Sequence, residues 1–246
     1  MDLNEMLRRM ERLEARGEIE NLLGEYLHLR MAGDGQAILE RIWSRREDIR
    51  IEYGASGPYQ SRSKVATFYQ KDCLPGKFTL LQANTPVIRV AGDGRSARGL
   101  WMVLGTETDA GDLGPEPPTD PNRRALLSSQ TPEGRAYTAE WTFLRLGADF
   151  LKEEAGWRLW HLHVYEIMRA PYDQDWVQYA TKRFETDGMR LDALFRSNLP
   201  FGEEEPPENL ATGATTFHWQ YTVDGLPPAL PRVPEPYQST EDMEQF

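Results

Sequence analysis

The residues best suited to chemistry lie in one short run, residues 160–166 (WHLHVYE). The run has the composition of a β-strand, in which every second side chain points to the same face. His161, His163 and Tyr165 are therefore expected together on one face. Histidine titrates near neutral pH and serves as an acid or base, and a tyrosine hydroxyl can donate a hydrogen bond to an oxyanion. These side chains predict proton-transfer chemistry, such as elimination beside a carbonyl group or isomerisation of an enone.

Residues 160–166 could also have roles other than proton transfer. The same alternation places Trp157 and Leu159 further back on the histidine face, and that face could meet solvent or another subunit instead of a cavity. A metal site at the two histidines is not expected. No third ligand is near them in the sequence, and the remaining histidines are His28 and His218.

Several further residues are candidates for the wall of a pocket. Tyr26 belongs to a helical stripe and is either an ordinary core residue or a pocket residue. Glu140 could act as an acid or base if it is buried, and on an outer sheet face it would be exposed. Arg169 follows the last predicted strand and either neutralises an anionic substrate or is solvated. An apolar cage could form from the aromatic residues Tyr53, Trp101, Trp141 and Trp160.

The composition is that of a folded protein with a sizeable core. Of 246 residues, 39% are hydrophobic and 11% are aromatic. The net charge of -11 argues against nucleic acid or an anionic membrane as a partner. Cys73 is the single cysteine, so no disulfide can form within the chain. Residues 1–19 lack the apolar segment of a signal peptide and no run is long enough to span a membrane, so we expect a cytoplasmic protein.

The order of predicted elements sets the fold class. Helical spacing recurs over residues 3–13 and 19–27 with an interruption at Gly17, and shorter helices are expected at 37–43 and 61–70. Strands are expected at 49–53, 78–90, 96–108, 137–152 and 157–167, with hairpin turns at 92–95 and 154–156. Helices followed by antiparallel hairpins predict an α+β fold, with the helices on one face of a sheet.

The C-terminal part differs in composition from the rest. Residues 109–122 are expected to form a loop and residues 175–196 a helix. After residue 199 the chain is acidic and rich in proline, and it is either disordered or an ordered extended arm. We favour the ordered arm, because disordered segments usually lack apolar anchors such as Phe217, Trp219, Tyr221 and Tyr237.

Three stretches of the chain, in their order and spacing, resemble the SnoaL-like domains of the nuclear transport factor 2 (NTF2-like) superfamily. They are residues 19–34, residues 84–93 and residues 137–165. The resemblance implies an NTF2-like cone, with N-terminal helices packed in a curved antiparallel sheet and a C-terminal helical and proline-rich extension. It divides the chain into an N-terminal helical extension (1–17), a SnoaL/NTF2-like domain (18–170), a C-terminal helix (171–198) and a proline-rich acidic arm (199–246).

The resemblance also bears on site residues. The superfamily includes bile-acid 7α-dehydratase, scytalone dehydratase and polyketide cyclases, as well as domains that only bind or assemble. Its dehydratases are similar to each other in a tyrosine on the opening helix and an aspartate five residues later. Tyr26 matches the tyrosine, whereas Met31 stands at the aspartate position. No histidine is present at 81–83, where the dehydratases have one, and Tyr53 is placed near the cavity mouth.

Two classes of function follow. The first is a cofactor-independent, dehydratase-like lyase acting on a small hydroxylated cyclic, steroid-like or aromatic compound. In it Tyr26 would orient the substrate, His163 with His161 would move the proton, and Tyr165 would hydrogen-bond the carbonyl oxygen. An isomerase or cyclase could use the same pocket. The second class is a non-catalytic protein that binds a small molecule or assembles, in either case as a homo-oligomer, dimer or trimer.

One geometric question separates the two classes. If His163 and Tyr26 border the same enclosed space, the lyase mechanism stands. If the two side chains lie on opposite sides of the sheet, this mechanism is lost and a binding protein is favoured.

Overall fold

The computed structural model describes residues 2–54, 57–109, 129–130, 136–178, 211–213, 221–243 and 245–246. It opens with helix α1, Leu3–Met31, whose first turn is capped by the Asp2 side chain accepting from the Glu5 amide at 2.7 Å. The helix continues through Gly17, so the interruption expected there is wrong. A glycine costs only about 1 kcal/mol in a helix interior, and a 29-residue helix tolerates that cost.

Short helices complete the helical layer. α2 (Gly35–Ala37) continues into the π-helical segment η1 (Ile38–Ile42), and α3 spans Arg62–Asp72. Asp34 and Ser61 cap the first turns of α2 and α3 with their side-chain oxygens, which accept otherwise unpaired backbone amides. The predicted helices at 37–43 and 61–70 are therefore confirmed within a few residues.

The sheet contains β1 (Arg50–Tyr53), β2 (Pro58–Gln60), β3 (Lys77–Val90), β4 (Ser96–Asp109), β6 (Ala136–Glu153) and β7 (Gly156–Pro171). Their spatial order is β2-β1-β7-β6-β4-β3, and β5 (Ser129–Gln130) pairs with the start of β6. The two long hairpins were predicted. The sequence did not indicate that β1 joins β7 in parallel, which is the one parallel pair among these strands.

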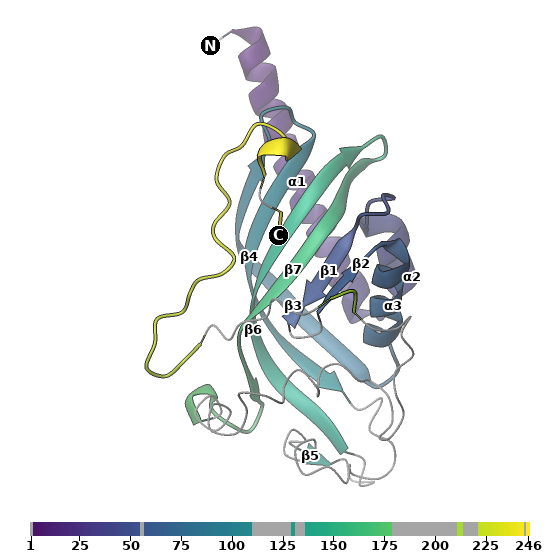
Figure 1. Ribbon diagram of the computed structural model, residues 1–246, viewed down its shortest axis with the longest axis vertical. Helices are drawn as coiled ribbons and strands as arrows, with labels where there is room; N and C mark the ends of the chain where they lie inside the picture. Colours follow the sequence, from purple (N-terminus) through teal and green to yellow (C-terminus); the bar gives the residue numbers. More distant parts are fainter. Residues whose placement is uncertain are drawn as a thin grey trace.

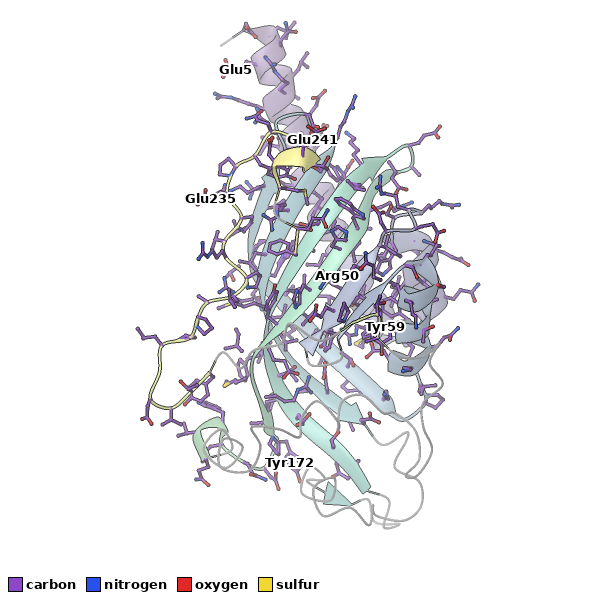
Figure 2. The ribbon with its side chains drawn as sticks, viewed as in Figure 1. Glu5, Arg50, Tyr59, Tyr172, Glu235 and Glu241 are labelled. Atoms are coloured by element: carbon purple, nitrogen blue, oxygen red, sulfur yellow. The ribbon has the colours of Figure 1, made fainter. Side chains whose placement is uncertain are left out.

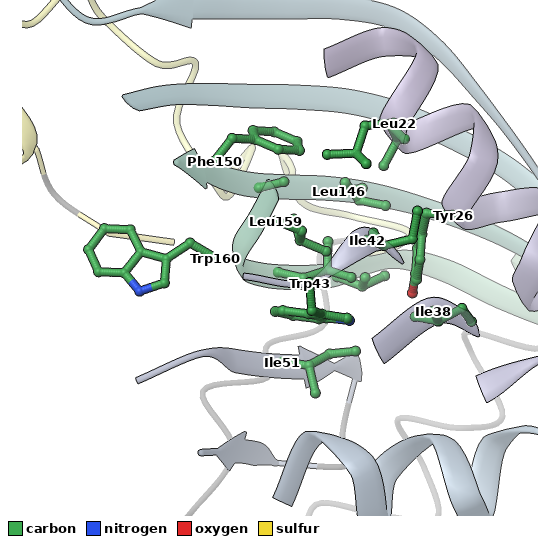
Figure 3. Close-up of a cluster of buried hydrophobic side chains, with 14 of the residues drawn as sticks. Leu22, Tyr26, Ile38, Ile42, Trp43, Ile51, Leu146, Phe150, Leu159 and Trp160 are labelled. Carbon is green, nitrogen blue, oxygen red and sulfur yellow. The ribbon is translucent and has the colours of Figure 1, made fainter. Parts of the chain in front are cut away.

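The sheet is curved and has two different faces (Figure 1). We call the face covered by α1 and α3 the inner face and the opposite one the outer face. The core lies on the inner face, where Tyr26, Ile38, Trp43 and Leu146 gather between helix and sheet (Figure 3). The Trp43 indole donates a hydrogen bond to the Tyr69 hydroxyl at 3.0 Å within this core. The architecture confirms the expected α+β class, with helices on one face of an open sheet.

Two β-bulges in β7 decide which side chains reach which face. Phe150 of β6 pairs with Leu159 and Asp149 pairs with His161, so Trp160 is an extra residue. Leu144 pairs with Glu166 and Phe143 with Met168, so Ile167 is a second extra residue. Each bulge reverses the alternation along the strand.

The last described residues lie against the outer face. The backbone carbonyls of Tyr237 and Gln238 accept the amides of Gly92 and Asp93 in the β3–β4 turn. The Tyr237 hydroxyl meets Ser96 at 3.0 Å, and Phe246 is buried at 7% exposure. Figure 1 shows this segment in front of the sheet and α1 behind it. Residues 221–243 are thus an extended segment, which is one part of the arm that the sequence predicted for residues 199–246.

Several predictions from the sequence concern residues outside the described ranges or boundaries inside an element. Most of the predicted helix at 175–196, most of the loop at 109–122, and the anchors Phe217 and Trp219 lie outside the described residues. The proposed boundary between residues 17 and 18 falls inside α1. Within the described ranges, no helix has the length and apolar character needed to cross a membrane.

Candidate functional site on the inner face

A cluster of charged and phenolic side chains lies at the inner face, where β1, β4, β6 and β7 run side by side. We call it the inner cluster. Strand pairing explains the gathering, because Glu107 of β4 is opposite Glu140 of β6, and Thr142 two residues later is opposite Arg169 of β7. Side chains at such paired positions point to the same face. The members are Arg30, Tyr53, Asp72, Glu107, Glu140, Glu166 and Arg169.

The centre of the inner cluster is a hydrogen bond between two residues from distant strands. The Tyr53 hydroxyl donates to Glu107 Oε1 at 2.5 Å. Burial raises the pKa of Tyr53 well above its ordinary value, and the charge of Glu107 raises it further. Burial alone would raise the pKa of Glu107, but the guanidinium groups of Arg169 and Arg30 outweigh it and hold this pKa below the usual range. At neutral pH the pair is therefore a neutral phenol donating to a carboxylate.

Arg169 connects the three glutamates of the inner cluster. One guanidinium nitrogen lies 2.7 Å from Glu107 and 2.9 Å from Glu140, and its Nε lies 2.9 Å from Glu166. Glu166 and Arg169 are three residues apart, a spacing that puts two side chains on opposite faces of a regular strand. The bulge at Ile167 restores them to the same face. Arg169 is 9% exposed, so the predicted solvated arginine is wrong.

Helix α1 adds the second cation. Arg30 pairs with Asp72 through two hydrogen bonds of 2.8 and 3.0 Å, and its guanidinium lies 4.1 Å from the centre of the Tyr53 ring. Tyr26, one turn earlier, is fully buried and packs edge-on against Tyr69. Burial raises the pKa of Tyr26, against the opposing charge of Arg30. Tyr26 is thus both a core residue and a neighbour of the inner cluster.

Among the described residues, three buried polar atoms in or beside the inner cluster have no hydrogen-bond partner. They are the hydroxyls of Tyr26 and Thr142 and the Oε2 atom of Glu166. Roughly nine in ten or more of the buried polar groups in proteins are hydrogen-bonded, and a catalytic role or a bound molecule is among the explanations for the exceptions. These atoms can therefore accept or donate a hydrogen bond to a bound molecule.

The histidines lie on the other side of the sheet. His163 Nε2 is 3.7 Å from Glu52, which points away from the inner face because Tyr53, the next residue, points into it. His161 Nδ1 meets Asp149 at 3.1 Å, and the His163 and Tyr165 rings stack at 3.8 Å. His161, His163 and Tyr165 do share a face, as expected, but it is the outer face. Tyr26 and His163 consequently do not border one common space.

The bulge at Trp160 also corrects the expected neighbours of the histidines. Leu159 pairs with Phe150 in the inner core, so Leu159 and Trp157 lie on the opposite face from His161. Trp160 instead stacks on His161, with ring centres 4.0 Å apart, and its indole donates to Asp48. Figure 3 shows the Trp160 ring apart from the rest of the core.

The electrostatic state of His163 follows from its site. Burial is the main cause that lowers its pKa to about 4, and the attraction of Glu52 opposes this only in part. The pKa of Tyr165 rises to about 12, first through burial and then through the charge of Glu52. At neutral pH His163 is a neutral imidazole held in a structural contact.

The remaining predicted pocket residues are divided between the two faces. Trp101 is 3% exposed and packs edge-on against Phe150, deep in the inner core. Trp141 is 46% exposed on the outer face, because its neighbour Glu140 takes the inner position. Met31 ends α1 at 43% exposure. An aromatic cage that combines Trp101, Trp141 and Trp160 therefore does not form.

Sequence reasoning named Tyr53, Glu140 and Arg169, and it missed Arg30, Glu107 and Glu166. Arg30 follows Tyr26 by four residues, so helical spacing could have found it. Glu107 could be found only once the β4–β6 register was known. Among the described residues, no group of three or more histidine, cysteine, aspartate or glutamate residues is arranged to hold a metal ion.

Solved structures share this fold at low sequence identity. A protein from Novosphingobium aromaticivorans named as a candidate scytalone dehydratase has a TM-score of 0.50 and 11% identity, covering 80% of this chain and 99% of that one. A structure named LinA has a TM-score of 0.50 and 12% identity, covering 68% of this chain and 96% of that one. Hexachlorocyclohexane dehydrochlorinase LinA-type3 from Novosphingobium barchaimii has a TM-score of 0.49 and 12% identity, covering 68% and 96%.

Comparison with curated protein sequences gives no match. The sequence profile described as SnoaL-like domain matches residues 11–163, which is more than half of the chain. This range contains α1, the β3–β4 hairpin, β6 and the first half of β7. The order of these elements is the NTF2-like arrangement that the sequence predicted, and the chain belongs to the family of SnoaL-like domains.

Proposed function

We propose that this protein is a cofactor-independent lyase that acts on a small hydroxylated cyclic, steroid-like or aromatic compound at the inner cluster. The observation that carries the proposal is the buried contact between Tyr53, Glu107 and Arg169, beside a Glu166 oxygen without a partner. The printed names of two structures with this fold, a dehydratase and a dehydrochlorinase, describe eliminations. Their likeness to this chain supports only the fold.

The mechanism with His163 as the base is lost, because His163 lies on the outer face. In the lyase that we propose, a carboxylate of the inner cluster takes the place of that histidine. Glu166 Oε2 is buried and free to accept a proton from the carbon beside a carbonyl group. The phenol of Tyr26 stays neutral and donates a hydrogen bond to the carbonyl oxygen, whereas the single hydroxyl proton of Tyr53 is already donated to Glu107. Arg169 and Arg30 stabilise the developing negative charge. The proton taken by the base and the hydroxide that leaves make one water molecule, with no change of oxidation state.

A second candidate is a protein that binds a small molecule without transforming it. The observation that favours it is the position of both histidines on the outer face, which removes the residues best suited to proton transfer near neutral pH. The low pKa of Glu107 also makes this carboxylate a weak base. An isomerase or cyclase would use the same inner cluster as the lyase.

The test measures turnover and binding separately. The full chain is assayed with a panel of cyclic β-hydroxy ketones and β,γ-unsaturated ketones, both of which give ultraviolet-absorbing enones. Glu166→Gln should lower kcat at least about 100-fold, whereas Glu154→Gln in the exposed β6–β7 turn and His163→Gln should change it little. Binding is followed by tryptophan fluorescence, and circular dichroism confirms folding.

Three outcomes separate the candidates. Loss of kcat with retained binding in Glu166→Gln supports the lyase. Saturable binding without turnover in the unmodified protein supports the binding function. A kcat that depends on His163 and not on Glu166 would overturn the assignment to the inner face.

A further inference from the structure

The outer face carries a buried arginine without a partner. Arg145 of β6 is 9% exposed, its Nε is fully buried, and within the part of the chain that the structure describes it has no hydrogen-bond or ion-pair partner. Burial alone lowers its pKa, since no carboxylate is near enough to counter it. An anion bound there would neutralise this charge and could accept from the buried Nε, and a bound ion is one of the explanations for a buried polar group that a protein leaves unpaired.

Two other arginines of this face have buried carboxylates as partners. Arg50 pairs with Glu52 at 2.7 Å, and Arg98 pairs with Asp149 at 3.3 Å. The remaining arginines that the strand register puts on this face donate to backbone carbonyls; they are Arg89 and Arg158. Among the described arginines of the outer face, Arg145 therefore differs in having neither kind of partner.

The neighbours of Arg145 define what kind of anion fits. Tyr165 and Met102 are its direct cross-strand partners, and Met102 is 50% exposed, which leaves an approach from solvent. The next row along the same face is apolar and consists of Leu104, Phe143 and Met168. The guanidinium offers hydrogen-bond donors to an anion, while the apolar row offers a surface to the rest of the molecule.

A cavity extends this apolar row. It has a volume of about 380 Å³ and is lined by Trp141, Phe143, Met168, Ala170, Tyr172, Asp173, Gln174, Asp175 and Trp176. Phe143 and Trp176 face each other with ring centres 6.4 Å apart. Figure 2 labels Tyr172 at this lower end of the sheet and Arg50 nearer its middle. The carboxylates of Asp173 and Asp175 disfavour a second negative charge at this end.

We propose that Arg145 binds the carboxylate of an organic anion whose apolar body lies on Phe143 and the adjoining cavity. The site is on the opposite face from the inner cluster and does not depend on the function proposed for that cluster. The carboxylate belongs to a free small molecule, because the adjoining cavity of about 380 Å³ has the size of a small-molecule site; an aspartate or glutamate of a second copy of this chain is the occupant that the test has to separate from it. Both sources use the same charge-assisted hydrogen bonds.

The test uses the full chain, with benzoate as the probe and benzamide as its uncharged counterpart. Isothermal titration should show binding of benzoate, and Arg145→Met should weaken it about tenfold or more. Arg95→Met removes an arginine in the exposed β3–β4 turn and should leave binding unchanged. Because methionine fills the space of the arginine stem without a charge, the Arg145→Met variant should also remain folded.

Light scattering distinguishes the two sources. A dimer that Arg145→Met abolishes and benzoate dissociates places the carboxylate on a second copy. Benzoate binding with an unchanged molecular mass places it on a free small molecule. Equal affinity for benzamide and benzoate, or for the Arg145→Met and unmodified proteins, would overturn the proposal, as would the absence of both benzoate binding and a dimer that depends on Arg145.

Discussion

The two faces of one sheet hold opposite charge balances. The inner cluster contains two guanidinium groups and four carboxylates, which belong to Asp72, Glu107, Glu140 and Glu166. In the middle of the outer face, Arg50 and Arg98 pair with the carboxylates of Glu52 and Asp149, and a further guanidinium group, that of Arg145, has no carboxylate partner. The inner face can therefore take up a proton or a positive charge, and the outer face can take up an anion. The strands that separate them are the same, so alternation alone divides the two kinds of chemistry.

The largest expected effect comes from removing the inner cation. Arg169→Met leaves three glutamates without their shared partner, and we expect a loss of about 3 kcal/mol in the free energy of unfolding at pH 7.5. The matched change Arg145→Met on the outer face removes a charge that has no partner, so it should not lower stability. Urea unfolding of both variants measures the difference. Equal losses would mean that the two faces do not differ in charge balance.

A smaller effect is expected from the anchor of the C-terminal arm. Asp149 meets Arg98 and His161 and accepts the Phe246 amide at 2.9 Å, so Asp149→Asn should cost about 2 kcal/mol. The amides of Gly92 and Asp93, which bond to the arm, should then exchange faster with deuterium. The control is Glu154→Gln in the β6–β7 turn. Unchanged exchange at these amides would show that the arm is held independently of Asp149.

The depressed pKa of His163 predicts a dependence on pH. In the unfolded chain the imidazole binds a proton near its usual pKa of 6.5, whereas in the fold it does so near 4. The unfolded state therefore binds more protons between these values, and stability falls as the pH drops through this window. From pH 7.5 to 5.5 this residue should cost about 1 kcal/mol. The loss on acidification should be smaller by that amount in His163→Gln, measured by urea unfolding.

The smallest effect concerns a single hydrogen bond of the arm. Tyr237→Phe removes the contact with the Ser96 hydroxyl and should lower the free energy of unfolding by about 1 kcal/mol. Urea unfolding checks the value. Since this residue is remote from Arg145, benzoate binding should be unaffected, and a change in affinity would show that the arm and the outer-face site are coupled.

The sequence predicted the elements better than the site. The Gly92-Asp93-Gly94 turn and the long alternating strands on both sides of it have local signals, and these hairpins formed as expected. The face of the sheet to which each β7 side chain points could not be predicted in the same way, because the extra residues Trp160 and Ile167 carry no recognisable sequence signal. Each of them shifts all later side chains of β7 by one position. The histidines consequently reached the outer face, and Arg169 reached the inner one.

The contacts between charged side chains on different strands could not be predicted from the sequence either. Glu107 and Glu140 are 33 positions apart in sequence, and only the register of β4 against β6 brings them to the same arginine. Tyr53 joins them because β1 adds to β7 in parallel. No local pattern predicts such a pairing, since it depends on which strand edges remain open after the hairpins have formed.

The bulge at Trp160 has a consequence for how this protein can change over generations. A point substitution alters one side chain but leaves it on its own face of the sheet. Loss of the single codon for Trp160 would remove the extra residue, so His161 would follow Leu159 directly and would stay opposite Asp149. The bulge is therefore a place where this strand can lose one residue while the histidines keep the outer face and Glu166 keeps the inner one.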